Sequence, residues 1–326
     1  MSLFKDRKVL VTGGTGLVGH FLVDILIAEE AKVRVAVNKK PAPKNVEAVH
    51  GDLTKMESCI EAVKGIDFVF HLAQVTGGVA KNQAHPAEMF TPNLLMNTQM
   101  LEAARLENVE RYLFPSSICI YSDMDIFTEE RGWDARPHVT NEAYGWAKRM
   151  GELQAQLYHK DYGMKIAIVR PTNTYGPYDN FDIETSHVIP AIIRKAAEKQ
   201  DPLTLWGNSE VTRDFIYSKD VASGHLLALE RYPVADPLNL ATGRSVSIRE
   251  LAAMILELSE HHPSKIVFDK SKPVGQFKRA VANQKALDKI GFRAKVTLEE
   301  GLEETIRWYK KSYSVQPKLK NAKILP

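Results

Sequence analysis

The first half of the chain alternates short apolar, β-branched runs with longer segments whose apolar residues recur every three or four positions. The short runs predict strands at residues 8–12, 32–37, 47–50, 68–72, 112–115 and 165–169. The longer segments predict helices at residues 17–30, 56–64, 88–107 and 141–162. Strands that alternate with helices pair in parallel and are covered by helices on both faces. The pattern therefore predicts an α/β fold with a Rossmann-type doubly wound parallel sheet.

This alternation ends after Pro171, where Gly, Pro, Asn and Asp cluster at residues 172–182. Helices are predicted at 188–199, 221–231, from 247 onward and at 298–310, and extended segments at 203–206, 215–217 and 265–268. We expect residues 215–217 to return to the main sheet. The predicted division is a Rossmann domain of residues 1–175 with 212–245, and a smaller C-terminal substrate-binding domain of residues 176–211 and 246–326.

Composition narrows the class of protein without identifying it. The chain has 326 residues, more than one minimal core needs, and a formal net charge of only +3. So small a net charge does not indicate a nucleic-acid-binding protein. No apolar run is long enough for a membrane helix. The N-terminus lacks the apolar core of a signal peptide, and two cysteines imply no disulfide framework. We expect a cytoplasmic protein with no metal site.

A glycine-rich turn follows the first predicted strand and precedes the first helix. Gly13, Gly16 and Gly19 have the spacing that permits a tight turn, close approach of a pyrophosphate, and close packing of helix on strand. A phosphate then binds the free N–H groups at the helix start. The alternative is a turn with no ligand. The motif predicts a dinucleotide site formed by Thr12, Gly13, Thr15, Gly16, Leu17, Val18 and Gly19.

The end of the second strand bears on the choice of cofactor. NAD sites usually place an acidic residue there to bind the ribose 2′-hydroxyl, but this sequence has Asn38, Lys39 and Lys40. Two cations suit a 2′-phosphate, so NADP(H) is favoured over NAD(H). The alternative is that both lysines lie in a solvated loop. Asp52, after the third strand, is placed to bond the adenine amino group.

A second motif lies in the predicted helix at residues 141–162. Tyr144 and Lys148 are four residues apart and so share one helix face. A lysine ammonium beside a phenol is expected to lower the pKa of the phenol, which can then shuttle a proton at neutral pH. Ser117, at the tip of the fifth strand, would hydrogen-bond the reacting oxygen. All three are expected at the carboxyl edge of the sheet, where ligands bind.

These motifs, with residues 71–73, 170–177 and 213–217, resemble the extended short-chain dehydrogenases that act on nucleotide-activated sugars, over nearly the whole chain. The resemblance implies an enzyme with a nucleotide-sugar substrate. It also implies a homodimer packed through the helices at 88–107 and 141–162. Further cofactor contacts implied by it are Leu53, Leu72, Ala73, Tyr144, Lys148, Pro171, Asn173 and His187.

Within this family, residues 77–79, 117–121, 180–181, 186–191 and 272–279 are similar to the GDP-L-fucose synthases. That resemblance implies a GDP-linked 4-keto-6-deoxy sugar. Cys119 would remove a proton beside the keto group, and His187 would return one to the opposite face. Reduction at C4 by NADPH would follow, with Tyr144 as the proton donor. Implied substrate contacts are Asn173, Val188, Lys195, Trp206, Arg213 and Arg279.

Other interpretations stay open at this point. The form of the glycine turn and residues 212–217 are also similar to sugar 4-epimerases, which hold NAD and need no Cys–His pair. Cys119 could be a small buried apolar residue and His187 a structural one. A dehydratase is disfavoured, because Ile118 and Cys119 stand where such enzymes carry carboxylates. A non-catalytic dinucleotide sensor is a remote alternative, against which Ser117, Tyr144 and Lys148 argue.

Overall fold

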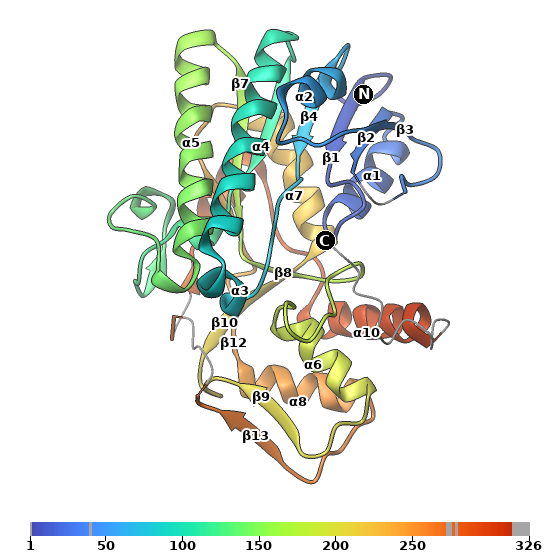
Figure 1. The fold of residues 1–326 in the computed structure, drawn as a ribbon, viewed down its shortest axis with the longest axis vertical. Coiled ribbons are helices and arrows are strands. Elements are labelled where there is room, and N and C mark those ends of the chain that lie inside the picture. The colour runs from blue at the N-terminus through green and yellow to red at the C-terminus, as the bar shows by residue number, and fades with distance from the viewer. Residues whose placement is uncertain (1, 39–40, 272–275, 278–279, 315–326) are drawn as a thin grey trace.

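The computed structural model describes residues 2–38, 41–271, 276–277 and 280–314. Its centre is a seven-stranded sheet in the order β11-β7-β5-β4-β1-β2-β3, in which every neighbouring pair is parallel (Figure 1). The predicted Rossmann-type sheet is thereby confirmed. The strand order reverses beside β1, and such a switch point opens a crevice at the carboxyl ends of the strands. The strands are β1 (Lys8–Thr12), β2 (Lys32–Val37), β3 (Glu47–His50), β4 (Phe68–His71), β5 (Arg111–Pro115), β7 (Lys165–Pro171) and β11 (Leu238–Leu240).

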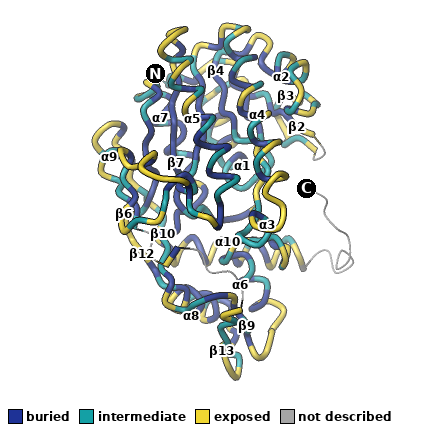
Figure 2. Tube along the Cα trace, turned by 60° about the vertical axis from the view of Figure 1, so that its left-hand side comes forward, coloured by how far each residue is buried: buried dark blue, intermediate teal, exposed yellow. Residues whose placement is uncertain are grey.

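Helices cover both faces of this sheet. Alternate residues of a strand point to opposite faces, so Phe68 and Phe70 enter one apolar core while Val69 enters the other. The strands are accordingly buried between two layers (Figure 2). One layer contains α2 (Met56–Val63), α4 (Pro86–Leu106) and α5 (Glu142–Tyr162), and the other α1 (Gly19–Ala28), α7 (Ser218–Arg231) and α9 (Gln284–Ile290). Within the described residues, no helix combines the length and apolarity needed to cross a membrane.

A smaller part of the chain lies beyond the carboxyl edge of the sheet, in the lower half of Figure 1. It has its own apolar core, which includes Ile192, Leu251 and Leu302. Its strands are β8 (Asn173–Tyr175), β9 (Leu203–Trp206), β10 (Thr212–Tyr217), β12 (Ser245–Ser247) and β13 (Ile266–Asp269), and its helices are α6 (Val188–Ala197), α8 (Ile248–Leu258) and α10 (Leu298–Ser314). Outside this part, α3 (Val79–Ala84) follows β4, and β6 (Ile126–Phe127) pairs with β14 (Ala280–Val281).

The prediction that residues 215–217 return to the main sheet is wrong. Phe215–Tyr217 pair with β8 in a separate three-stranded sheet, and β11 takes the seventh position beside β7. The three residues of β11 are too few to reveal a period in the sequence. The predicted domain division stays a prediction. Within its C-terminal range, Ala286 and Ile290 of α9 pack into the core of the large sheet.

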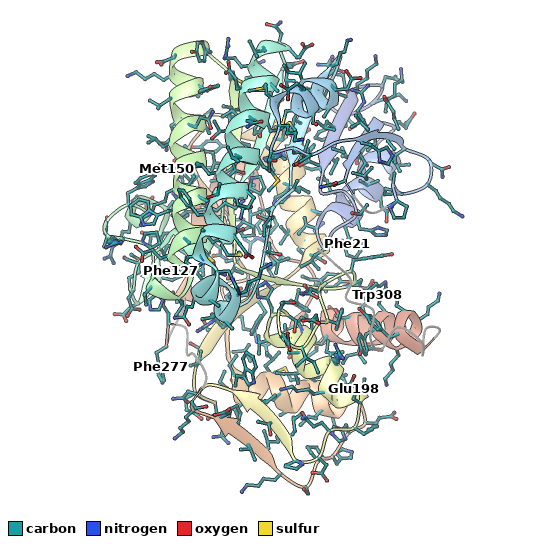
Figure 3. All side chains as sticks on the ribbon, in the orientation of Figure 1. Phe21, Phe127, Met150, Glu198, Phe277 and Trp308 are labelled. Carbon is teal, nitrogen blue, oxygen red and sulfur yellow. The ribbon has the colours of Figure 1, made fainter. Side chains whose placement is uncertain are left out.

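Aromatic side chains join the smaller part to α1. The rings of His20 and Tyr178 lie 3.8 Å apart, and those of Tyr178 and Trp308 lie 4.9 Å apart. Phe21, also on α1, contacts the Tyr217 ring at 5.8 Å. Figure 3 shows Phe21 and Trp308 on the two sides of this junction. The helix that begins at the glycine turn is therefore packed directly against the smaller part.

A fully buried ion pair links β7 to α5. The guanidinium of Arg170 donates to both carboxylate oxygens of Glu152, at 2.8 and 2.7 Å, and the two side chains are 1% and 0% exposed. Arg170 also donates to the hydroxyl of Tyr121 at 2.9 Å. This bidentate geometry satisfies most of the polar atoms that burial removes from water. The pair fixes α5 and the segment after β5 relative to the sheet.

Replacing Arg170 with Met should lower the free energy of unfolding by about 3–5 kcal/mol, because Glu152 would remain buried without a counter-charge. Urea denaturation measures this loss. Arg307→Met is the matched control, since it removes an exposed ion pair with Glu303 and should change stability little. Equal losses in the two variants would contradict the assignment.

Candidate active site

The glycine turn between β1 and α1 has no room for larger residues. Gly13 has a φ of +67°, and a Cβ there would lie 2.8 Å from the backbone carbon of Leu72. A Cβ on Gly19 would collide with the carbonyl oxygen of Gly13. Helix α1 begins at Gly19, and no side chain caps it at Val18. The tight turn and uncapped helix start fit a pyrophosphate, with Thr15, Gly16 and Leu17 in the same turn.

The residues predicted to contact the adenosine end lie after β2 and β3. Asn38 is exposed directly after β2. Asp52 Oδ1 accepts hydrogen bonds from the hydroxyl and the N–H of Thr54, at 2.8 and 3.0 Å, and these bonds lower the pKa of Asp52. Leu53 beside it is buried. Lys39 and Lys40 lie outside the described residues, so the argument for a 2′-phosphate stays a prediction.

A buried polar pair, Thr12 and His71, lies next to the glycine turn. Thr12 Oγ1 lies 3.0 Å from Nδ1 of His71 and accepts a hydrogen bond from the N–H of Ala73 at 2.9 Å. Burial, with a smaller contribution from the charge of Lys148, lowers the pKa of His71 to about 3. His71 is therefore neutral at physiological pH. The sequence offered no partner for this histidine, because Thr12 and His71 meet only through the pairing of β1 with β4.

The predicted catalytic residues come together at the carboxyl edge of β5. Lys148 Nζ lies 5.5 Å from the ring centroid of Tyr144 and donates a hydrogen bond to the Pro115 carbonyl at 2.7 Å. Pro115 ends β5 and leads into Ser117, whose hydroxyl accepts from the N–H of Cys119 at 3.1 Å. Helix α5 and the segment after β5 thus bring the predicted side chains to one place.

The expected lowering of the Tyr144 pKa is wrong. Tyr144 is only 8% exposed, and burial, with a smaller contribution from the charge of Cys119, raises the pKa of its phenol. Burial also lowers the pKa of Lys148 to about 7, so its ammonium is only partly populated at neutral pH. The sequence shows the spacing of the two side chains but not the loss of solvent around both.

The smaller part of the chain supplies His187. This residue is the N-cap of α6 and is exposed, although the protein around it lowers the pKa of its imidazole by desolvation. The preceding segment is tied to the loop after β4, because the N–H of Gly78 donates to the carbonyl of Thr185 at 3.3 Å. Cys119 and His187 therefore come from different parts of the fold, as their predicted roles require.

Two of the predicted substrate contacts are engaged with the protein backbone. The side-chain amide of Asn173 donates to the carbonyl of Asp214 at 2.8 Å. Lys195 is buried, and its ammonium donates to the carbonyl of Thr204 at 2.6 Å. Neither side chain is directed by these bonds toward a ligand. Their roles in substrate binding stay predictions.

The remaining predicted contacts lie along the smaller part. Val188 is the first residue of α6, next to His187, and Trp206 is exposed at the end of β9. Arg213 on β10 donates to the carbonyl of Gln276 at 2.6 Å. Pro171 ends β7, and Arg279 lies outside the described residues. In the described part of the chain, no group of three or more His, Cys, Asp or Glu residues could hold a metal ion.

The sequence motifs did not identify one partner of the predicted catalytic phenol. The Tyr144 hydroxyl donates to Oε1 of Gln74 at 2.6 Å. Gln74 lies three residues after the end of β4, at the carboxyl edge where ligands bind in such sheets. A polar residue so soon after a predicted strand could have indicated from the sequence that Gln74 lies at the ligand-binding edge.

Comparison with known proteins places the chain among enzymes of nucleotide sugars. Residues 9–241 match the NAD dependent epimerase/dehydratase family. The chain is 33% identical to GDP-L-fucose synthase of Sinorhizobium fredii over 308 residues, which cover 93% of this chain and 95% of the relative.

Two solved structures show the same architecture with different cofactors. One is a GDP-L-fucose synthetase from Naegleria fowleri bound to NADP, with a TM-score of 0.82, 29% identity and 96% coverage of each chain. The other is UDP-glucose 4-epimerase of Thermus thermophilus in complex with NAD, with a TM-score of 0.81 and 26% identity, covering 93% of this chain and 99% of that one. Proteins similar to this chain therefore include users of both cofactors.

The buried Lys148 should make stability depend on pH. Its pKa is about 7 in the folded protein against 10.5 for a free lysine, so between pH 7 and 9 only the unfolded chain keeps this proton. The free energy of unfolding should therefore rise with pH in this window, by up to about 1.4 kcal/mol per pH unit.

Urea denaturation at pH 7, 8 and 9 should show this slope in the wild type and not in Lys148→Met. Lys160→Met, an exposed change on the same helix, should keep it. A slope unchanged in Lys148→Met would refute the buried charge.

Proposed function

Because the chain belongs to the NAD-dependent epimerase/dehydratase family, and is thus a nicotinamide-dependent enzyme of nucleotide sugars, we propose that it epimerises and reduces a GDP-linked 4-keto-6-deoxy sugar with NADPH. The observation that carries the proposal is the position of Cys119. It follows Ser117 by two residues and lies close enough to influence the pKa values of both Tyr144 and Lys148. A 4-epimerase needs no Cys–His pair. The relatives named GDP-L-fucose synthase support the choice of GDP.

Epimerisation needs a base and an acid on opposite faces of the sugar. The 4-keto group acidifies the protons on C3 and C5, and Cys119 as thiolate removes one of them. Ser117 and Tyr144 stabilise the negative oxygen of the resulting enolate by hydrogen bonds. His187, from the other part of the fold, returns a proton to the opposite face. Its lowered pKa makes the imidazolium a stronger acid than a free histidine.

Reduction of C4 uses the same site. The glycine turn and Lys148 would hold NADPH, which supplies the hydride when bound. Tyr144 then donates the proton to the forming alkoxide. Its raised pKa suits this role, since the phenol stays protonated at neutral pH. Lys148 beside it compensates the charge of the phenolate that remains.

The second candidate is a nucleotide-sugar 4-epimerase that retains NAD. The observation that favours it is the structural similarity to the 4-epimerase of Thermus thermophilus, which binds NAD. Such an enzyme oxidises and re-reduces the same carbon, so it shows no net use of cofactor. Asn38 weighs against it, because it provides no carboxylate for the ribose 2′-hydroxyl.

We also propose a homodimer formed through α4 and α5. These two helices pack side by side on the outside of the sheet (Figure 1). Leu95 and Leu106 on α4, and Leu153 and Leu157 on α5, are large apolar residues exposed to solvent. An apolar surface of this kind is typical of a surface that a second copy covers.

Turnover of GDP-4-keto-6-deoxymannose with NADPH in heavy water tests the function. We expect NADPH consumption and two solvent deuterons fixed in the product, read by mass analysis. Cys119→Ser should slow deuterium uptake at least about 100-fold, since it removes the base. Cys59→Ala, which removes the buried thiol of α2, should keep uptake unchanged.

Two other outcomes would change the assignment. NADPH consumption without deuterium would indicate a simple 4-reductase and remove the roles of Cys119 and His187. No consumption, with NAD bound to the purified protein, would favour the 4-epimerase.

Leu157→Glu should convert the dimer to a monomer, because it places a charge within the apolar surface of α4 and α5. Sedimentation velocity measures the change in mass. Ile266→Glu alters an exposed apolar residue on β13 and should leave the dimer intact. A monomeric wild type would contradict the proposed assembly.

A further inference from the structure

The loop between β4 and α3 brings a carboxamide to the catalytic phenol. Tyr144 is almost fully buried, yet its hydroxyl donates to Oε1 of Gln74 at 2.6 Å, and Gln74 itself is exposed. An exposed residue bonded to a buried hydroxyl marks the side from which a ligand can reach that hydroxyl. Gln74 therefore lies between solvent and the Tyr144 hydroxyl.

The backbone around Gln74 is held in place. Val75 and the side chain of Asn93 on α4 exchange two hydrogen bonds, each at 2.9 Å. Farther along the loop, the N–H of Gly78 donates to the carbonyl of Thr185, just before His187. The loop thus connects a helix on the sheet to the segment that presents His187. These bonds hold the backbone on the C-terminal side of Gln74 and do not involve the Gln74 side chain.

A phenol has one proton and can donate only one strong hydrogen bond. A ligand oxygen that accepts this proton displaces Gln74 from the bond but leaves its carboxamide alongside. That carboxamide has one acceptor oxygen and two N–H donors, so it can bind a hydroxyl in either sense. In a keto sugar, the carbon next to the reacting carbonyl carries such a hydroxyl.

We propose that Gln74 is a substrate-contacting specificity residue. When the substrate binds, its keto oxygen replaces Gln74 as the acceptor of the Tyr144 hydrogen bond. The Gln74 carboxamide then hydrogen-bonds the 3-hydroxyl on the adjacent carbon. The inference rests on the proposed function, because it requires a 4-keto sugar at Tyr144. A site that offers a polar group to a hydroxyl discriminates against the sugar that lacks it, since the polar group is then left without that partner.

The test compares two substrates, GDP-4-keto-6-deoxymannose and the same sugar without its 3-hydroxyl, by NADPH consumption. The wild type should prefer the hydroxylated sugar in kcat/KM by about tenfold or more. Gln74→Leu keeps the size of the side chain but removes its polar atoms. It should lower kcat/KM about tenfold for the hydroxylated sugar and leave the 3-deoxy sugar unchanged. Gln74→Ala should behave in the same way, and Gln83→Leu, an exposed change on α3, should match the wild type.

Loss of the preference in both Gln74 variants, with NADPH affinity unchanged, supports the inference. Equal losses on the two sugars, or no loss on either, would overturn it while leaving the proposed function intact. A wild type that turns over neither sugar would remove the proposed function, and this inference with it. Activity of the wild type therefore separates the two failures.

Discussion

The buried ion pair between Arg170 and Glu152 holds together the elements on which the site is built. Arg170 lies at the end of β7, next to Pro171, and Glu152 lies on α5, four residues after Lys148. The remaining guanidinium nitrogen binds the Tyr121 hydroxyl, two residues beyond Cys119. Strand, helix and loop are therefore fixed to one another by a single charged group. Burial makes this ion pair rigid, because separating Arg170 from Glu152 would leave an unpaired charge in the protein interior.

Helix α5 holds the segment after β5 through a second set of bonds. Lys148 donates to the carbonyl of Pro115, and the adjacent Arg149 donates to the carbonyl of Ile120. These two carbonyls flank Ser117 and Cys119. The segment that carries the two predicted catalytic side chains is thereby fixed through its backbone, so their orientation does not depend on bonds that a ligand would have to break.

The same burial determines the acid–base state of the site. Removal of water raises the pKa of Tyr144 and lowers that of Lys148, so the phenol is protonated and the lysine partly neutral near pH 7. A protonated phenol is the state that the proposed reduction requires, because it can donate to a forming alkoxide. The Tyr144 proton is held in a hydrogen bond to the exposed Gln74.

The sequence by itself determined the features that depend on local order. The alternation of strands and helices, the glycine turn at Gly13 and the spacing of Tyr144 and Lys148 all follow from residues close in the chain. Tertiary structure decided what depends on distant segments. The three residues of β11 become a strand only beside β7, and His71 acquires its partner only through the pairing of β1 with β4. Burial of the ammonium of Lys195, the raised pKa of Tyr144 and the approach of Gln74 likewise arise from packing. Periodicity and spacing describe the chain along its own length, whereas solvent exclusion and hydrogen-bond partners are set by segments that only folding brings together.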